Sequence, residues 1–228
     1  MPSSKRYQPV AALVEPKKTY STQEAIDLVK KTATEHFDAA VELHARLGVD
    51  PKKGDQQVRG TVSLPHGTGK TRRVAVFCEP DKEKEAKDAG ADIVGAEELV
   101  TQVLQSGKCN FDVAVATPSM MPKIAKLAKL LGPKGLMPNP KNETVTPAIG
   151  RAVTELKAGK ITFKNDDTGN VHAVIGRISF TKEQLTENFN AFMDVIKKLR
   201  PASAKGTFIR ALIMTSSMGP AIRVQISF

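Results

Sequence analysis

The hydrophobic pattern of this chain changes twice along its length, and the two changes constrain the fold more than any other feature. Between residues 37 and 47, apolar and polar positions alternate, the apolar set being Phe37, Ala39, Val41, Leu43, Ala45 and Leu47. Alternation over this length predicts a strand with one buried and one solvated face. The middle of the chain lacks this alternation, which returns after residue 160.

The middle of the chain alternates short apolar runs with helical patterns. The runs lie at 74–78, 91–94 and 111–117, and the predicted helices at 81–89, 96–105, 119–131 and 146–158. This order predicts a parallel sheet covered on both faces, an open Rossmann-like α/β domain. No Gly-x-Gly-x-x-Gly turn follows the first run, so the layout alone does not predict a dinucleotide.

The outer segments show a different pattern of predicted elements. A capping box at Ser21–Glu24 predicts a helix, and a strand at 58–64 is expected to pair antiparallel with residues 37–47. After the middle region we predict a hairpin of 160–164 with 171–175, an amphipathic helix at 181–198, and strands at 207–214 and 222–228.

Neither outer segment has a sensible core of its own. We therefore predict a two-domain α/β protein in which residues 1–67 and 160–228 form one split α+β domain with an antiparallel sheet. Residues 68–159 form the inserted Rossmann-like domain. Glycines at both crossings, Gly67, Gly69 and Gly159, supply dihedral freedom for a hinge.

The segment Gly67-Thr-Gly-Lys-Thr71 also resembles the end of a P-loop, which would make the protein a nucleotide-binding enzyme. A P-loop needs a glycine where Leu64 stands, and Pro65 removes one backbone donor. Lys70 also leads into a predicted strand, whereas a P-loop opens a helix. We favour the connector and keep the enzyme as the alternative.

The net charge of +10 indicates a polyanionic partner, most often nucleic acid. The split domain carries +7 of this charge and the insert +3. Within the insert, the stretch from Pro118 to Lys141 has five lysines and no acid: Lys123, Lys126, Lys129, Lys134 and Lys141. This secondary basic patch is either a solvated helix face or a weaker second contact with a polyanion.

The sequence does not indicate a metal site or a catalytic site. Cys78 and Cys109 fit neither a metal-ligand spacing nor a redox pair, and three of the histidines, His44, His66 and His172, are too scattered for a metal site. No catalytic set stands out, so we expect no enzyme, cofactor or metal. Without a long apolar run or a secretory signal, we expect a cytoplasmic protein without a membrane span.

Three runs carry a family resemblance: Val58-Arg-Gly-Thr-Val-Ser-Leu-Pro-His-Gly67, Leu131-Gly-Pro-Lys-Gly-Leu-Met-Pro-Asn-Pro140 and Thr215-Ser-Ser-Met-Gly-Pro220. They closely resemble the bacterial ribosomal protein L-one family, the RNA-binding protein of the large subunit's mobile stalk. The resemblance spans essentially the whole chain. It implies a structural protein of the large ribosomal subunit that binds 23S rRNA, assists release of deacylated tRNA from the exit site, and represses translation of its own mRNA. A free-standing translational repressor remains a second alternative.

The resemblance also implies an RNA surface built from three segments. Its residues are His36, Phe37, Ala40, Glu42, Asn165, Asp166, Thr168, Gly169, His172, Thr215, Ser216, Ser217, Met218 and Gly219. Family members often have lysine at position 36 and threonine at position 217. With no Trp and two Tyr, the chain lacks a stacking platform, so small hydroxyls and a carboxylate would read 2′-hydroxyls and base edges of structured RNA.

Three of these residues have a second interpretation. Glu42 could be an ordinary solvated strand residue, Phe37 the first core residue of its strand, and Met218 a packing plug in a turn. We expect the free protein to be a monomer.

Overall fold

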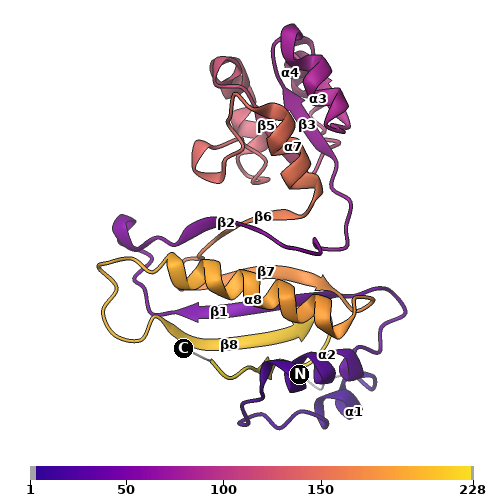
Figure 1. Cartoon of the computed structure of the whole chain (residues 1–228), viewed down its shortest axis with the longest axis vertical. Helices are drawn as coiled ribbons and strands as arrows, with labels where there is room; N and C mark the ends of the chain where they lie inside the picture. Colours follow the sequence, from indigo (N-terminus) through magenta and orange to yellow (C-terminus); the bar gives the residue numbers. More distant parts are fainter. Residues whose placement is uncertain (1–3, 227–228) are drawn as a thin grey trace. The chain divides into compact units, whose positions relative to one another are not determined.

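The computed structural model describes residues 4–226 of the 228-residue chain. The chain forms two compact units (Figure 1). The split unit joins the segment up to Gly69 with the segment from Ile161 onward, and the inserted unit is Lys70–Lys160. The split antiparallel unit and the parallel insert confirm the predicted fold class.

A four-stranded antiparallel sheet forms the centre of the split unit. Its order is β7 (Asn170–Arg177), β1 (Ala40–Leu47), β8 (Ile209–Ser216) and β9 (Ile222–Arg223). His44 of β1 lies opposite His172 of β7 and Ile213 of β8. The central strand therefore has partners contributed by a segment more than 100 residues later in the chain.

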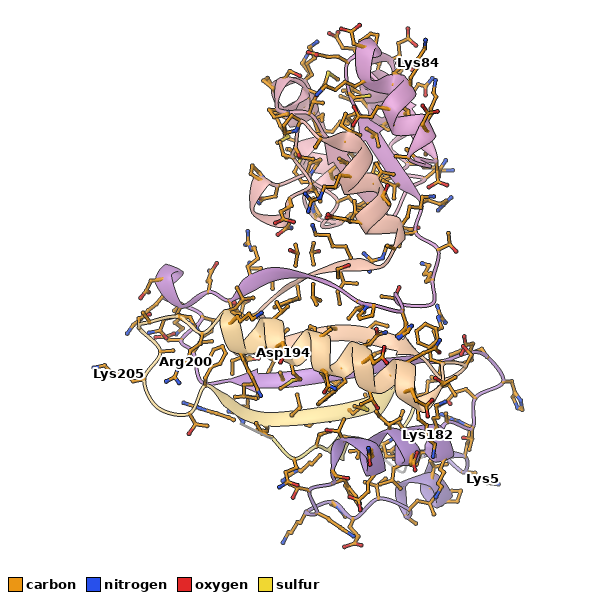
Figure 2. All side chains as sticks on the ribbon, viewed as in Figure 1. Lys5, Lys84, Lys182, Asp194, Arg200 and Lys205 are labelled. Carbon is orange, nitrogen blue, oxygen red and sulfur yellow. The ribbon has the colours of Figure 1, made fainter. Side chains whose placement is uncertain are left out.

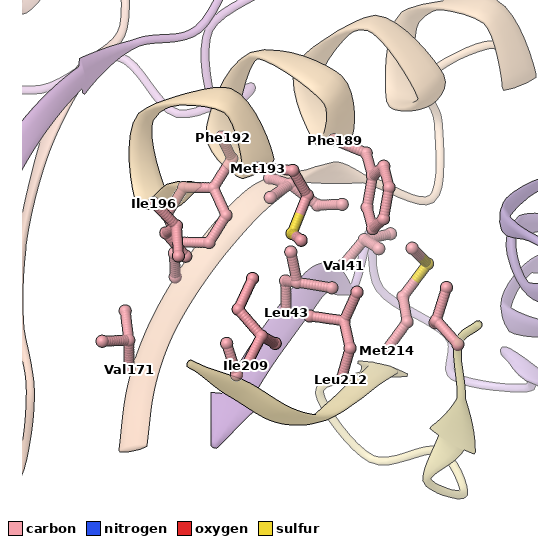
Figure 3. Close-up of a cluster of buried hydrophobic side chains, with 14 of the residues drawn as sticks. Val41, Leu43, Val171, Phe189, Phe192, Met193, Ile196, Ile209, Leu212 and Met214 are labelled. Carbon is pink, nitrogen blue, oxygen red and sulfur yellow. The ribbon is translucent and has the colours of Figure 1, made fainter. Parts of the chain in front are cut away.

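Helices α2 (Thr22–Thr32) and α8 (Lys182–Lys198) pack against one face of this sheet. Both begin with capping boxes, at Ser21 and Thr181, and such boxes satisfy backbone donors at a helix start. The buried strand residues Val41 and Leu43 meet Phe192 of α8 in the shared core (Figure 3). The predicted buried face of residues 41–47 is confirmed, but Phe37 precedes β1 and is exposed.

Two predictions of strand pairing are wrong. β2 (Arg59–Ser63) does not join β1, and β6 (Lys160–Lys164) does not form a ladder with β7. β2 and β6 instead pair with each other in a separate two-stranded sheet. Val62 and Phe163 from this pair reach the same core as α8, so burial rather than sequence proximity decides the pairing.

The inserted unit is a three-stranded parallel sheet of order β4 (Ile93–Gly95), β3 (Val74–Phe77) and β5 (Val113–Ala116). Separate buried clusters cover its two faces. One contains residues of α4 (Glu97–Ser106), and the other residues of α3 (Glu83–Asp88) and α7 (Ile149–Lys157). Burial on both faces explains why its strands have uninterrupted apolar runs.

Several short elements differ from the predicted ones. The expected helix at 119–131 is interrupted: η3 (Pro118–Met120), α5 (Met121–Ile124), η4 (Ala125–Leu127) and α6 (Ala128–Leu131) follow one another. The one-turn helix α1 (Tyr7–Ala11) was not predicted, because its N-cap position holds Arg6, whose side chain caps no backbone N–H, and the segment contains a proline. The remaining single turns are η1 (Gly54–Gln56), η2 (Pro80–Lys82) and η5 (Pro140–Asn142).

Residues 64–73, which contain the Gly-Thr-Gly-Lys-Thr segment, form neither helix nor strand and lead into β3. Lys70 Nζ lies 3.8 Å from the Asp112 carboxylate. A phosphate-binding loop requires a helix at this point, so the P-loop geometry is not met.

Candidate nucleic-acid interface

The second face of the four-stranded sheet carries the polar half of each alternating strand. On β1 these positions are Ala40, Glu42, His44 and Arg46, which are partly or fully exposed, while the residues between them are buried. The register places Val174 and Thr215 beside Glu42, and His172 beside His44. This open face therefore gathers residues from three segments that are far apart in the sequence.

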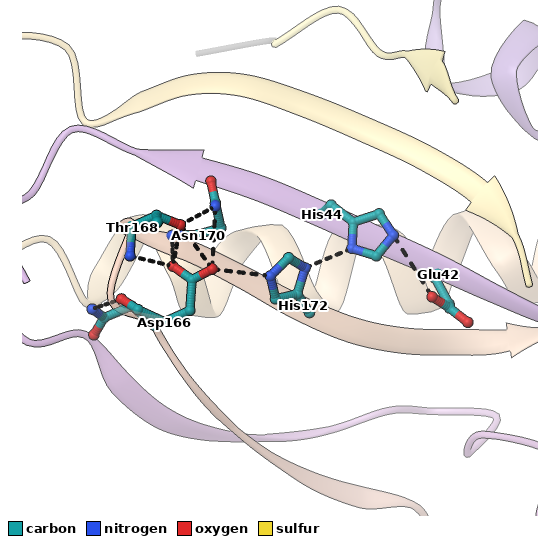
Figure 4. Close-up of polar contacts among 7 residues, drawn as sticks. Glu42, His44, Asp166, Thr168, Asn170 and His172 are labelled. Atoms are coloured by element: carbon teal, nitrogen blue, oxygen red, sulfur yellow. Dashed lines mark hydrogen bonds and ion pairs between the residues drawn. The ribbon is translucent and has the colours of Figure 1, made fainter. Parts of the chain in front are cut away.

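A line of polar side chains runs along this face, and we call Glu42, His44, His172 and Asp166 the polar stripe (Figure 4). The Nδ1 atoms of His44 and His172 are 2.8 Å apart. His44 Nε2 lies 3.7 Å from the Glu42 carboxylate, and His172 Nε2 lies 3.4 Å from that of Asp166. The stripe connects the two ends of β1.

The electrostatics of the stripe are set by burial and by its own hydrogen bonds. Partial burial lowers the pKa of His44, and the charge of His172 lowers it further, while Glu42 opposes both effects. The pKa of Asp166 lies well below its ordinary value, mainly because the Asn170 backbone N–H donates to it, with further donation from Thr168. At neutral pH Asp166 is a fixed carboxylate.

Several hydrogen bonds close the turn that carries Asp166. Asp166 Oδ1 accepts the backbone N–H groups of Thr168 (2.9 Å) and Asn170 (2.7 Å), and Gly169 has φ +80°, which glycine adopts readily. Asn165 is buried, and its Oδ1 accepts the Val58 N–H at 2.8 Å. Asn165 therefore holds the turn in place. Thr168 is exposed, although its hydroxyl donates to Asp166 and accepts from the Asn170 side chain.

The loop after β8 lies at the other end of β1. The Ala40 N–H donates to Ser217 Oγ at 3.2 Å, and Ser217 Oγ donates to Glu42 at 3.4 Å. A Cβ on Gly219 would come 2.3 Å from Ser216 Oγ, so this tight turn requires glycine. Ser216 is buried beneath the loop, and only its neighbours reach solvent.

Phe37 and Met218 project from this end of the sheet. Their exposed fractions are 56% and 57%, so neither is a core residue or a packing plug. His36 is also exposed. These side chains are therefore accessible to a ligand.

Comparison with known protein families identifies the family of this chain. Residues 29–220 match the model of the ribosomal protein L1p/L10e family. The chain belongs to this family. It is therefore an RNA-binding protein of the large ribosomal subunit, and ribosomal proteins of this family are generally structural.

In this ribosomal protein the structure brings the sequence-predicted residues into two clusters on one face. His36, Phe37, Ala40 and Glu42 adjoin the Thr215–Gly219 loop, whereas Asp166, Thr168 and Gly169 lie at the opposite end of β1. His172 lies between the clusters. Asn165, Gly169 and Ser216 are buried and support the neighbouring backbone.

The resemblance did not include His44 or Arg6, yet both contact predicted residues of this ribosomal protein. His44 completes the polar stripe, and the period-two pattern of β1, which places it on the same face as Glu42, could have found it. Arg6 Nη2 donates to the Met218 carbonyl at 3.3 Å, and Nη1 reaches Thr34 Oγ1 at 3.0 Å and Glu35 at 3.2 Å. No local pattern in the sequence indicates this long-range contact.

The secondary basic patch of the ribosomal protein lies on the interrupted helix of the insert. Lys123, Lys126 and Lys129 are exposed, and Lys123 pairs with Glu97 at 2.5 Å. Lys134 Nζ lies 3.7 Å from Cys109 Sγ. The side chain of Lys141 lies outside the described residues.

The three predicted hinge glycines of the ribosomal protein, Gly67, Gly69 and Gly159, have positive φ values of 65°, 72° and 109°. The Gly67 carbonyl accepts a hydrogen bond from Asn188 at 3.0 Å. A Cβ on Gly69 would lie 2.6 Å from the Arg177 side chain.

The described residues, 4–226, contain no helix that is long and apolar enough to cross a membrane. Nor does that part of the chain contain a cluster of three or more potential metal ligands.

Proposed function

We propose that the open face of the split unit binds the mobile-stalk region of 23S rRNA. The observation that supports this most strongly is the convergence of three distant segments on one uncovered sheet face, joined by the polar stripe. The proposed contacts are His36, Phe37, Ala40, Glu42, Asp166, Thr168, His172, Thr215, Ser217, Met218 and Gly219, with the buried Asn165, Gly169 and Ser216 supporting them.

The chemistry of this face suits folded RNA. The hydroxyl oxygens of Thr168 and Ser217 can accept hydrogen bonds from 2′-hydroxyls across a shallow minor groove. Glu42 would be repelled by phosphate and can only accept from a ribose hydroxyl or a base amino group. Phe37 and Met218 offer apolar contact to riboses rather than an extended stacking platform.

We further propose that the same surface binds the protein's own mRNA and thereby represses its translation. A shared surface makes the two RNAs mutually exclusive, so rRNA would relieve repression. The protein would act as a non-enzymatic monomer when free. From its place on the stalk, the protein would also contact deacylated tRNA at the exit site.

The proposed hinge uses both chain crossings. Contacts within the split unit hold Gly67 and Gly69, so rotation would occur between Gly69 and β3 at one crossing and around Gly159 at the other. The secondary basic patch would provide a weaker second RNA contact from the inserted unit.

A paired substitution tests the main surface. The variant F37A/M218A removes two exposed apolar side chains, and we expect its affinity for a 23S rRNA stalk transcript to fall at least about tenfold, a change of 1.4 kcal/mol. The matched control is L13A/L104A, because Leu13 and Leu104 are similarly exposed, at 56% and 49%, outside the proposed surface. Equal affinities of the two double variants would contradict the proposal.

The same variants test repression. In a cell-free translation reaction, wild-type protein should reduce translation of a reporter that carries its own mRNA leader, and added stalk rRNA should restore it. The variant F37A/M218A should repress weakly, while L13A/L104A should repress like wild type. Repression by F37A/M218A at the wild-type level would show that rRNA and mRNA bind at different sites.

A further inference from the structure

A basic groove crosses the open face beyond the polar stripe. It has a volume of about 470 Å³ and is lined by residues of β1, β8 and β9, with Asn170 of β7 and Thr19 at its margin. Three of its side chains are arginines, Arg46, Arg210 and Arg223, and all three are exposed. We call these three residues the arginine groove.

The charge of this groove is not neutralised by neighbours. No aspartate or glutamate is among the described residues that line it. Within residues 4–226, none of the three guanidinium groups donates a hydrogen bond or forms an ion pair. By contrast, Arg151 pairs with Glu155, and Arg6 with Glu35. Three unpaired guanidiniums around one groove are a site for an external anion.

The register defines the spacing of these arginines. Arg46 on β1 lies opposite Ala211, the residue after Arg210, while Arg223 on β9 lies opposite Ile213. Arg46 and Arg223 are two strands apart, which corresponds to roughly 10 Å across the sheet. Charges spread over this distance suit a chain of phosphates better than one small anion.

The groove is continuous with the proposed RNA surface, because His44 belongs to both the polar stripe and the groove lining. Ile213 lies beside His44 and leads to Arg223 on the edge strand. An RNA that rests on the stripe would therefore extend its backbone over the three arginines.

We infer that the arginine groove binds consecutive backbone phosphates of the RNA that occupies the open face. This inference rests on the proposed function and assigns the groove a separate role. The polar stripe and its end loops contact riboses and base edges, whereas the groove supplies affinity that does not depend on sequence. Its guanidinium forks can donate paired hydrogen bonds to phosphate oxygens.

The test is the salt dependence of RNA binding. For wild type and R46Q/R210Q/R223Q, the dissociation constant for the stalk transcript is measured over a series of salt concentrations. Each lost phosphate contact reduces the slope of log affinity against log salt by about 0.7 to 0.9. We therefore expect the triple variant to lose roughly 2 to 3 units of slope and to bind more weakly at every salt concentration.

Two control variants separate the groove from general charge. K52Q/K84Q/K108Q removes three exposed lysines outside the groove and should retain the wild-type slope; Lys84 is labelled in Figure 2. R46K/R210K/R223K keeps the charge and should retain most of the slope while losing the paired hydrogen bonds. Circular dichroism and thermal unfolding establish that each variant is folded, and single substitutions replace any triple variant that is not.

The outcomes are distinct. A wild-type slope in R46Q/R210Q/R223Q, or an equal loss in K52Q/K84Q/K108Q, would overturn the arginine groove while leaving the proposed function intact. If the wild-type protein binds the stalk transcript no more tightly than it binds poly(U), the proposed function is wrong. The slopes on poly(U) would then decide whether the groove binds phosphates. Binding of inorganic phosphate that competes with RNA at millimolar concentration would identify a single-anion site instead.

Discussion

Two histidines on the open face share one proton position. His44 and His172 face each other through Nδ1 atoms 2.8 Å apart, so one ring must donate and the other accept. Only if both rings were charged would two Nδ1–H groups face each other. The charge of His172 lowers the pKa of His44, and this effect can be measured.

We predict that H172Q raises the pKa of His44 toward its ordinary value. The substitution removes the neighbouring charge that lowers this pKa, although the larger effect of burial remains. An NMR titration of the imidazole signals measures the change, and H66Q is the control because His66 instead pairs with Glu187. An unchanged or lower His44 pKa in H172Q would show that the two rings are not coupled.

The lowered pKa of His44 also predicts a pH dependence of stability. The folded state binds fewer protons at this site than the unfolded state, whose histidine has a pKa of about 6.5. This contribution is present above that value and is lost as pH falls through the lower folded pKa. We expect unfolding free energies of wild type to decline more than those of H44Q between about pH 7 and 5. Parallel declines would contradict this assignment.

A buried amide fixes the segment that follows β2. Asn188 is fully buried, accepts the His66 N–H at 3.1 Å, and donates to the carbonyls of Gly67 (3.0 Å) and Ile175 (2.7 Å). N188A would leave these backbone groups without their side-chain partner, which costs about 1–3 kcal/mol of stability. N190A on the exposed side of α8 is the control, with an expected change within about 0.5 kcal/mol.

Tyrosine fluorescence measures this effect in the split unit alone. The chain has no tryptophan, and its two tyrosines, Tyr7 and Tyr20, both belong to the split unit. Urea unfolding followed by tyrosine emission therefore excludes the inserted unit. Equal unfolding midpoints for N188A and N190A would show that the Asn188 hydrogen bonds add no stability.

At the scale of elements, Arg6 connects three segments of the split unit. It joins the start of α1 to the α2–β1 connection and to the loop after β8. The side chain of its partner Glu35 is 2% exposed. Loss of Arg6 would leave a buried carboxylate unpaired and the Met218 loop less ordered, and ordering a loop on binding reduces affinity.

We predict that R6A weakens binding of the stalk rRNA by about tenfold, mainly through faster dissociation. R6K should fall between wild type and R6A, because one ammonium keeps the charge but cannot reach three acceptors. Surface plasmon resonance measures the dissociation rates, and K5Q tests the neighbouring lysine on the same segment. If R6A and K5Q bind alike, Arg6 does not position the loop.

Local signals predicted the helices well and the strand pairings poorly. Capping boxes at Ser21 and Thr181 act within one turn, so the starts of α2 and α8 could be read directly. Strand pairing is a long-range property. β2 pairs with β6, which follows the whole insert in the sequence, because their apolar faces share a core with α8. The interrupted helix at 118–131 escaped prediction because its apolar residues recur at spacings of three and four, which 3₁₀ and α turns both satisfy.

The same division applies to the candidate interface. Alternation along β1 predicted that Glu42 faces solvent, and the resemblance supplied the three segments. The burial of Asn165 and Ser216 could not be predicted, because it depends on contacts with Val58 and on the shape of the loop after β8. The arginine groove is likewise visible only once the register places three strands side by side.

At the scale of the whole molecule, each unit has buried clusters of its own. We predict that replacing residues 70–160 by a short Gly/Ser linker leaves the affinity for stalk rRNA within about tenfold of the full chain, because the proposed surface and most of the net charge remain. Filter binding at several salt concentrations measures this. Strong binding by the isolated insert and weak binding by the linked split unit would reverse the assignment.

The hinge proposal predicts a broad distance distribution between the units. Labels at K84C and K205C, in a C109S background, report one position in each unit, and both lysines are exposed (Figure 2). Pulsed electron-spin measurements should give a broad distribution for the free protein, and one that changes when RNA binds. One narrow distance, identical with and without RNA, would argue against a hinge.

The split arrangement also determines when the interface can exist during synthesis. The inserted unit is continuous in sequence and can fold as soon as it emerges, whereas β1 waits for β7 and β8, which are made after the whole insert. A nascent chain that has completed only the insert has neither the polar stripe nor the loop after β8. On the proposed function, partial products therefore lack the main RNA surface and keep only the weaker basic patch of the insert.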